Sequence, residues 1–466
     1  MLASVACVVI AGRSSISAAQ RVETVRPLTY TRVVLPNGLV ALLNEDHGSP
    51  IVAVDVWYHI GAKDEPAGRN GFAHLCEHLM GEGSPNLAGT EKAFVISHGG
   101  TSSRWANTTE DITHYYYTLP REQLERALWL ESDRMAAPLT RVDSAHLVAV
   151  REVIRQERAQ SRETPVFGRA DALTLSALFP GENPYRNDPL GPMNDLDAAT
   201  TASARQFCAP YYVPNNAVIS LSGDFSSANV RTLIERYFGD IERGPVPPRR
   251  PIPSIDARGA RLVLEDSRAR GATLRLAWPT VGFADADRLP LTALASLLSR
   301  DRTGTLSKLL VYDRPVATRV AAANFDFEHG GLFQIEVAPR PGVSLTLIEQ
   351  LVDSVLNAFV VTGRDEDLDS FKRSNAVTAI TQLQTRAARA DTLAHGELFA
   401  GDPVAYAKQV NRTFALTAAD VRRVFDKYLA RPHVVMSMIP AGKLDLISRP
   451  ELPYTNVTPP AGKSQP

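Results

Sequence analysis

The segment His74-Leu75-Cys76-Glu77-His78 has the residue types and the spacing that metal chemistry needs. On a helix, residues four apart lie one turn apart on one face, so both imidazoles can reach the same metal ion. Catalytic Zn²⁺ accepts two neutral imidazoles, a carboxylate and a water, and a neighbouring carboxylate can take the proton of that water. This order of residues is typical of inverted-motif zinc peptidases. It predicts His74 and His78 as ligands and Glu77 as the general base.

The flanking sequence predicts the elements that would position this motif. Residues 72–80 form an apolar stretch of helical character, and residues 51–60 alternate as a half-buried strand does. Residues 32–44 predict two strands joined at Pro36-Asn37-Gly38, because Asn-Gly readily adopts the positive φ of a tight hairpin turn. The zinc helix is therefore expected to pack on a sheet.

The second half of the chain repeats this order of strands and helices after a proline-rich segment, in which a helix cannot continue. We predict an α+β fold of two homologous domains, each a mixed or antiparallel sheet covered by helices. The predicted parts are a catalytic zinc-peptidase domain at 20–245, a linker at 246–255, a homologous C-terminal domain at 256–450 and a flexible tail at 451–466.

The composition excludes several classes of protein. The chain has 466 residues, with 50 Lys and Arg against 51 Asp and Glu, and thus a net charge of -1. A protein that coats nucleic acid needs clustered excess basic residues, so no nucleic-acid partner is expected. No apolar run reaches about 18 residues, so no membrane span is expected either.

Residues 1–19 combine a short apolar run with small residues, as in a secretory signal peptide. This predicts export, which in a bacterium means export to the periplasm. A signal peptide normally begins with basic residues, and none precedes this apolar run, so a cytoplasmic location is the alternative. Three cysteines are too few for a disulfide framework in a chain of this length. Cys76 is expected to fill the core face of its helix as a small buried residue, rather than to be a thiol near the metal, and Cys208 is also expected in the core.

The sequence resembles the pitrilysin, insulin-degrading-enzyme and mitochondrial-processing-peptidase family of zinc peptidases. The likeness rests on the zinc helix and on several further segments, namely Gly83-Ser84, Gly99-Gly100, Thr108, Asp111, Thr113, Tyr115, Leu190-Gly191, Tyr211-Tyr212-Val213-Pro214-Asn215-Asn216-Ala217 and Gly223-Asp224. It implies one zinc ion per chain, hydrolysis of extended or unfolded peptides, and a fold forming half of a clamshell around a peptide chamber. It also implies a third ligand from a later helix, where Glu157 occupies the matching position and Glu152 is the runner-up.

The sequence departs from the family pattern at the substrate-binding edge strand. Trp105 aligns where the family has an Asn that contacts the substrate backbone, and Asn107 is the candidate to replace it. An extended peptide could add to this edge as a further strand.

A second departure lies in the C-terminal half. Family enzymes that work alone have there an Arg and a Tyr that bind substrate, and those positions are Val311 and Thr318 in this chain. We therefore predict a heterodimer, in which this chain carries the metal and a homologous subunit supplies the Arg/Tyr pair. The alternative is a non-catalytic peptide-binding or scaffold subunit on the same fold.

Overall fold

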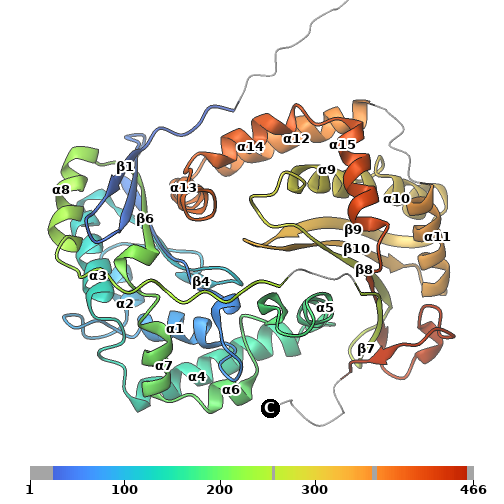
Figure 1. Ribbon diagram of the computed structural model, residues 1–466, viewed down its shortest axis with the longest axis horizontal. Coiled ribbons are helices and arrows are strands. Elements are labelled where there is room, and N and C mark those ends of the chain that lie inside the picture. Colours follow the sequence, from blue (N-terminus) through green and yellow to red (C-terminus); the bar gives the residue numbers. More distant parts are fainter. Residues whose placement is uncertain (1–24, 254–257, 359–364, 459–466) are drawn as a thin grey trace, which may run out of the picture.

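The computed structural model describes residues 25–253, 258–358 and 365–458, which form two six-stranded sheets with helices (Figure 1). The first sheet is mixed: β2 and β6 pair in parallel and the other neighbours are antiparallel. Its strands, in spatial order, are β1 (Thr31–Val34), β2 (Val40–Glu45), β6 (Ala217–Gly223), β3 (Ile51–Tyr58), β5 (Thr113–Pro120) and β4 (Ala106–Thr108).

The second sheet repeats this plan with later segments of the chain. Its strands, in spatial order, are β12 (Thr455–Asn456), β7 (Ala260–Asp266), β11 (Val434–Pro440), β8 (Thr273–Thr280), β10 (Gly331–Pro339) and β9 (Ala317–Asp326). β11 again pairs in parallel with the first strand of its unit, β7, and antiparallel with β8. The predicted α+β fold with two related sheets is confirmed.

The local sequence explains the start of each sheet. β1 and β2 form the predicted hairpin, and Gly38 in its turn has φ +93°, which a residue without a Cβ adopts at little cost. In β3 one face carries Val52, Val54, Val56 and Tyr58, all buried in the core of the first domain. The residues between them, Ala53, Asp55 and Trp57, are buried as well, so the predicted half-buried strand is wrong and β3 is covered on both faces.

Helices complete both domains. Those of the first are α1 (Phe72–Met80), α2 (Glu91–Ser97), α3 (Leu124–Ala136), α4 (Ser144–Arg158), α5 (Ala170–Leu178), α6 (Met193–Asp197), α7 (Thr201–Cys208) and α8 (Ser227–Phe238). Those of the second are α9 (Arg288–Ser299), α10 (Thr305–Ser307), α11 (Leu345–Asn357), α12 (Asp365–Gln382), α13 (Arg386–Ala400), α14 (Ala405–Thr413) and α15 (Ala418–Val424). The sequence analysis did not predict the helices after residue 358.

Each domain also lends one helix to the other. α13 of the second domain packs Leu393 and Ala394 against Leu42, Trp57 and Val218 on the first sheet. Conversely, α5 of the first domain packs on the second sheet, in a cluster that contains Leu175, Leu178, Leu264, Ala277 and Met436. Both helices lie between the two sheets in Figure 1, so each sheet is covered on both faces.

The segment predicted as a linker is extended over its described part and held against the first domain. Arg249 donates to the carbonyl oxygen of His59, and Arg250 donates to that of Glu65. Part of the expected flexible tail is ordered, because Thr455 and Asn456 pair with β7. The predicted signal peptide lies outside the described residues.

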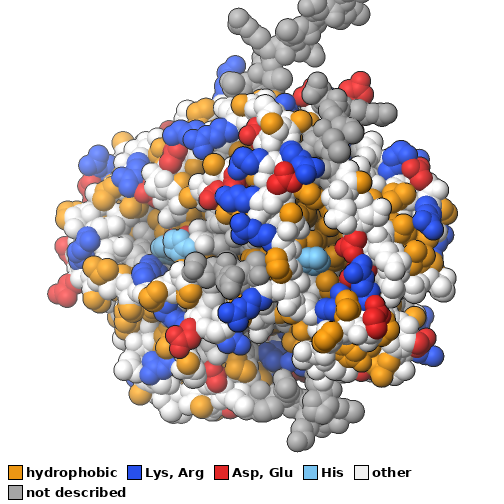
Figure 2. Space-filling view, turned by 45° about the vertical axis from the view of Figure 1, so that its right-hand side comes forward, with side chains coloured by type: hydrophobic (Ala, Val, Ile, Leu, Met, Phe, Trp, Pro, Cys, Tyr) orange, Lys and Arg blue, Asp and Glu red, His pale blue; other side chains and the backbone are white. Residues whose placement is uncertain are grey.

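The surface matches the balanced composition. Figure 2 shows basic, acidic and apolar side chains interspersed over one face of the molecule. Within the described ranges, no helix is long and apolar enough to cross a bilayer.

Candidate metal centre

The N-terminus of helix α1 is capped by the side chain of Glu65. Gly71 has φ +89°, and the buried Glu65 carboxylate accepts hydrogen bonds from the backbone N–H groups of Gly71 and Ala73, both at 2.8 Å. Burial raises the pKa of Glu65 well above its usual value, although these two bonds favour the charged form. The sequence analysis missed this cap, because Glu65 precedes the helix by a whole loop.

Three side chains converge beside α1. His74 Nε2 lies 3.1 Å from His78 Nε2, and Glu157 Oε2 on α4 lies 3.4 Å from the first and 3.3 Å from the second. The histidines are largely buried, whereas the Glu157 side chain is 42% exposed. The structure therefore brings together the three residues that the sequence predicts as ligands, with one side of the cluster open to solvent.

The environment sets the protonation of these groups. Burial lowers the pKa of His74 to about 4, so this imidazole is neutral at pH 7. Burial also acts to lower the pKa of His78, but its hydrogen bond to Glu157 and the charge of Glu77 raise it overall. The pKa of Glu157 is lowered despite partial burial, because His78 bonds to its carboxylate. His74 Nδ1 is buried and has no hydrogen-bond partner among the described residues, so the ring makes its polar contacts through Nε2 alone.

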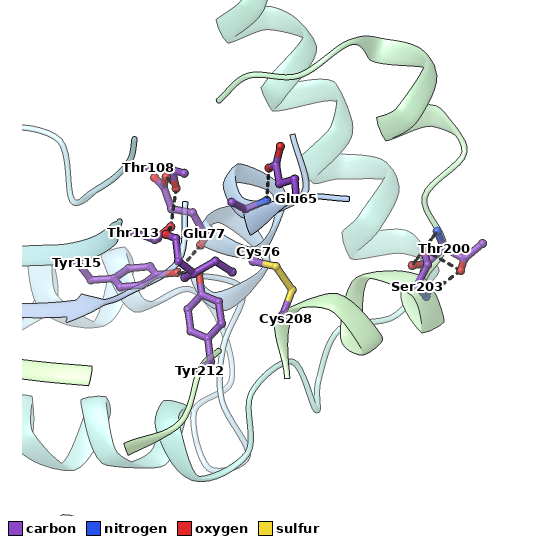
Figure 3. Close-up of a disulfide and its surroundings, with 12 residues drawn as sticks. Glu65, Cys76, Glu77, Thr108, Thr113, Tyr115, Thr200, Ser203, Cys208 and Tyr212 are labelled. Atoms are coloured by element: carbon purple, nitrogen blue, oxygen red, sulfur yellow. Dashed lines mark hydrogen bonds between the residues drawn. A yellow bond between two sulfur atoms is a disulfide. The ribbon is translucent and has the colours of Figure 1, made fainter. Parts of the chain in front are cut away.

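Glu77 lies on the same helix, next to the edge strand. It is 8% exposed, and its Oε2 accepts a hydrogen bond of 2.5 Å from Thr108 Oγ1 on β4. Thr113 Oγ1 lies 3.0 Å from Thr108 Oγ1, and Tyr115 Oη donates to the carbonyl oxygen of Glu77 (Figure 3). Burial raises the pKa of Glu77. The carboxylate is thus fixed in orientation and favours a bound proton more than an exposed glutamate does.

The predicted substrate residues lie on or beside β4, which is the last strand of its sheet; among the described residues it pairs with β5 alone, so its other edge is free there. Asn107 is half-buried opposite His114 and makes no side-chain hydrogen bond within the described chain. Trp105 has φ +76°, which is rare for a bulky residue. Its carbonyl oxygen accepts from the N–H of Tyr116. Both residues therefore border the free edge, and their roles in substrate binding stay predictions.

Other residues that the sequence singled out lie elsewhere. Glu152 is exposed on α4 and contacts Gln156 and Arg155, away from the histidines, because five residues on a helix turn to a different face. Thr318 donates to the carbonyl oxygen of Ala338, and Val311 packs against the core of the second domain.

The predicted burial of both cysteines is confirmed, but the bond between them was not predicted. Cys76 on α1 and Cys208 on α7 form a disulfide, with their Cα atoms 5.9 Å apart and a sequence separation of 132 (Figure 3). A crosslink across a loop of this length stabilises a fold by about 5 kcal/mol in the chain-entropy account. It ties the helix of the candidate centre to its neighbour.

A second group of potential ligands lies under α13. Asp55 Oδ1 is 3.1 Å from His114 Nδ1, and Asp391 Oδ1 is 4.0 Å from the same nitrogen. Burial acts to lower the pKa of His114, but the Asp55 charge raises it overall. The imidazolium pairs with Asp55, while burial and the charge of Asp55 raise the pKa of Asp391 to about 7, so the cluster is read as an ion pair between the domains.

The architecture defines the class of protein, a two-domain chain with the fold of inverted-motif peptidases. Residues 40–179 match the family description "Insulinase (Peptidase family M16)", and residues 198–375 match "Peptidase M16 inactive domain". The chain therefore belongs to peptidase family M16, as the resemblance implied.

Individual relatives agree with this assignment. The chain is 25% identical over 368 residues to "Zinc protease PqqE" of Helicobacter pylori, covering 76% of this chain and 80% of that one. It is 24% identical over 313 residues to "Mitochondrial-processing peptidase subunit beta" of Blastocladiella emersonii, covering 65% of each.

Solved structures share the fold. A "peptidase M16 inactive domain" from Pseudomonas fluorescens has a TM-score of 0.77 at 18% identity, covering 89% of this chain and 98% of that one. The periplasmic protease PqqL from Escherichia coli has a TM-score of 0.73 at 19% identity. The match covers 89% of this chain but 48% of PqqL, so one chain of the present kind corresponds to half of that protein.

Proposed function

We propose that this chain is a zinc-dependent endopeptidase that hydrolyses extended or unfolded peptides. The observation that carries the proposal is the convergence of His74, His78 and Glu157 beside the Glu77 carboxylate. The names of its relatives, which include zinc proteases, support it.

The donor set suits zinc. Two imidazole nitrogens and one carboxylate oxygen are typical ligands of a catalytic zinc ion, and the solvent-exposed side at Glu157 leaves room for substrate. The low pKa of His74 keeps one nitrogen unprotonated, as a ligand must be. A zinc ion bound here would act as a Lewis acid toward the scissile carbonyl and the attacking water.

The protein side chains would do the rest of the work. Glu77, held by Thr108, would accept the proton of the attacking water and pass it to the leaving amine. The substrate backbone would pair with the free edge of β4, with the Asn107 side chain beside it. Such pairing recognises an extended backbone, which is why unfolded segments are the proposed substrates.

The proposed active assembly is a heterodimer. Family members work as paired halves, as the match to half of PqqL illustrates. With Val311 and Thr318 at the positions of the family's Arg/Tyr pair, we propose that a homologous subunit supplies that pair.

We also propose that the chain is exported to the periplasm. Disulfides persist in oxidising compartments, so the Cys76–Cys208 bond supports export, as does the periplasmic location stated for PqqL. A cytoplasmic location is the alternative, and it predicts both thiols reduced in protein taken directly from cells.

A non-catalytic subunit is the second candidate function, favoured by the similarity to a solved inactive domain. Two measurements separate the candidates: the zinc content of the purified protein, and cleavage of a fluorogenic unfolded peptide with and without the co-purifying homologue. The proposal expects one zinc per chain, cleavage, and loss of cleavage in Glu77→Gln with its zinc retained. A protein with no zinc, or cleavage that survives Glu77→Gln, would overturn it.

A further inference from the structure

A large arginine-lined pocket lies beside the candidate metal centre, at the start of α5. Its volume is about 820 Å³. Five arginines line it, namely Arg158, Arg162, Arg169, Arg186 and Arg250, against the two carboxylates of Asp188 and Glu182. The wall is therefore strongly positive, in a protein whose overall charge is close to zero.

Three of these arginines donate hydrogen bonds to neutral backbone carbonyl groups. Arg186 Nη1 donates to the carbonyl oxygen of Gly181 at 2.6 Å, Arg250 donates to two carbonyl oxygens, and Arg158 donates to that of Gly191. A neutral carbonyl orients a guanidinium but leaves its charge available to an anion.

Acidic side chains neutralise only part of the positive charge of the pocket wall. Arg162 forms a two-pronged contact with Asp188, at 2.8 and 3.0 Å, and Glu163 lies 3.7 Å from Arg158. The pKa of Arg169 is lowered, first by burial and then by the charge of Arg158, although the charges of Glu163 and Asp188 act to raise it. Like charges are thus held close enough to act on one another, which an anion in the pocket would relieve.

The pocket adjoins the candidate centre along two paths. Arg158 directly follows Glu157 on α4. The wall residue Gly191 packs on Gly71, so closely that a Cβ on Gly191 would lie 2.6 Å from Gly71 Cα. Gly71 precedes His74 by three residues, about 4.5 Å along the helix axis.

The edge strand also leads toward the pocket. Glu110 follows Thr108 by two residues, in the turn after β4. Asp111, the next residue, accepts a hydrogen bond of 2.8 Å from Tyr185 Oη, and Tyr185 directly precedes the wall residue Arg186. This turn therefore lies near the pocket wall. A peptide added along β4 therefore passes Glu77 and continues toward the arginines.

We propose that this pocket is a substrate subsite that binds the carboxylate of an acidic side chain, a few residues from the scissile bond. The proposal rests on the proposed peptidase function and adds a substrate class to it. Forked guanidinium groups suit a carboxylate, and charge-assisted hydrogen bonds of this kind are among the strongest in proteins.

The test compares fluorogenic peptides that carry a single Glu or Gln at each of four positions on either side of the cleaved bond. We expect one position at which Glu raises kcat/KM at least tenfold over Gln, a preference that falls as NaCl is raised. Arg169→Glu and Arg186→Glu should abolish that preference and favour Lys instead. Arg126→Glu, an exposed site on α3 with the same change in charge, should keep it.

A binding arm separates this proposal from the peptidase proposal. Glu77→Gln is titrated with the same peptides and with tripolyphosphate, using fluorescence anisotropy and competition. If the wild-type protein cleaves no peptide, but Glu77→Gln binds the Glu peptide more tightly than the Gln peptide and this difference requires Arg169 and Arg186, the subsite is supported and the peptidase proposal is overturned. Cleavage without discrimination between Glu and Gln overturns the subsite. Arginine-dependent binding of tripolyphosphate, with equal binding of both peptides, also overturns it in favour of a phosphate site.

Discussion

The two domains have the same strand order, but only one of them carries the candidate chemistry. The helix α1 between β3 and β4 holds His74, Glu77 and His78, whereas the corresponding helix between β8 and β9 is α9. On α9 the buried positions are Pro290, Leu291, Ala293, Leu294, Ala295 and Leu298. At this place the fold therefore accepts a helix that buries His74 and Glu77 among apolar residues, or one whose buried residues are all apolar, so function resides in side chains rather than in topology.

The edge strands differ as well. β4 has three residues beside the candidate centre, whereas β9 pairs with β10 along most of its ten residues. The first domain also carries the disulfide, which uses both cysteines of the described residues. Residues 209–466 contain no cysteine, so the second domain has no such crosslink of its own. The first domain thus combines a short, accessible edge with a crosslinked helix.

The largest effect should come from removing the third ligand. Glu157→Gln is expected to lower kcat/KM by at least about 10³-fold and to reduce the zinc content, because a neutral amide is a poor zinc ligand. Both are measured on the purified chain, alone and with the proposed second subunit. Glu152→Gln, one helix face away, should change neither by more than about twofold; equal losses in the two variants would refute the assignment.

The disulfide should have the next largest effect. Cys76→Ala combined with Cys208→Ala is expected to lower the free energy of unfolding by about 5 kcal/mol, because the unfolded chain regains the freedom of a long loop. Urea denaturation of the oxidised protein, the reduced protein and the double variant measures this. The reduced protein should resemble the variant. Identical midpoints for all three would show that the bond adds no stability.

A buried ion network joins the two domains and offers a third test. Glu328 in the β9–β10 turn bonds to His59 at 2.7 Å and to Lys63 at 2.9 Å, both in the first domain. Glu328→Gln should cost about 2 kcal/mol at pH 7, because Lys63 retains its contact with Asp111.

The pH dependence of this effect follows from the sign of the pKa shift. Burial acts to raise the pKa of Glu328, but His59 and Lys63 lower it far below its usual value. The carboxylate therefore stabilises the fold above pH of about 4.3, and this contribution is lost as the pH falls further. Thermal melts should show the difference between the wild type and Glu328→Gln shrinking below that pH. A constant difference from pH 7 to pH 3 would contradict this account.

The smallest effect is expected at the edge strand. Thr108→Val removes the hydrogen bond that orients Glu77 and should lower kcat by about tenfold with little change in KM. Thr108→Ser keeps the hydroxyl and should retain most of the activity. A loss in Thr108→Ser as large as that in Thr108→Val would mean that packing by the methyl group, rather than the hydroxyl, is what matters.

The elements set by local sequence could be predicted well. The zinc helix at Phe72–Met80 and the hairpin at Gly38 follow from apolar periodicity and turn chemistry, which act over a few residues. Helical geometry also explains why Glu157 joins the histidines and Glu152, five residues earlier, does not.

The features that sequence could not reveal depend on contacts between distant segments. Cys76 and Cys208 lie 132 residues apart, and no spacing rule connects them. The Glu65 cap reaches α1 from a loop, and α13 covers a sheet that belongs to the other half of the chain. A single sequence indicates which residues are suited to such contacts, but it does not show which distant segments come together.

The exchange of α5 and α13 constrains how the chain can be divided and how it can move. A fragment cut at the proline-rich segment would lose one covering helix from each sheet, exposing Trp57 and Val218 on one side and Leu264 and Met436 on the other. Two separately expressed halves are therefore expected to be insoluble or to reassociate. For the same reason the domains cannot swing apart as rigid bodies joined by a hinge. In the proposed heterodimer, an opening that admits a polypeptide is therefore expected at the interface with the second subunit.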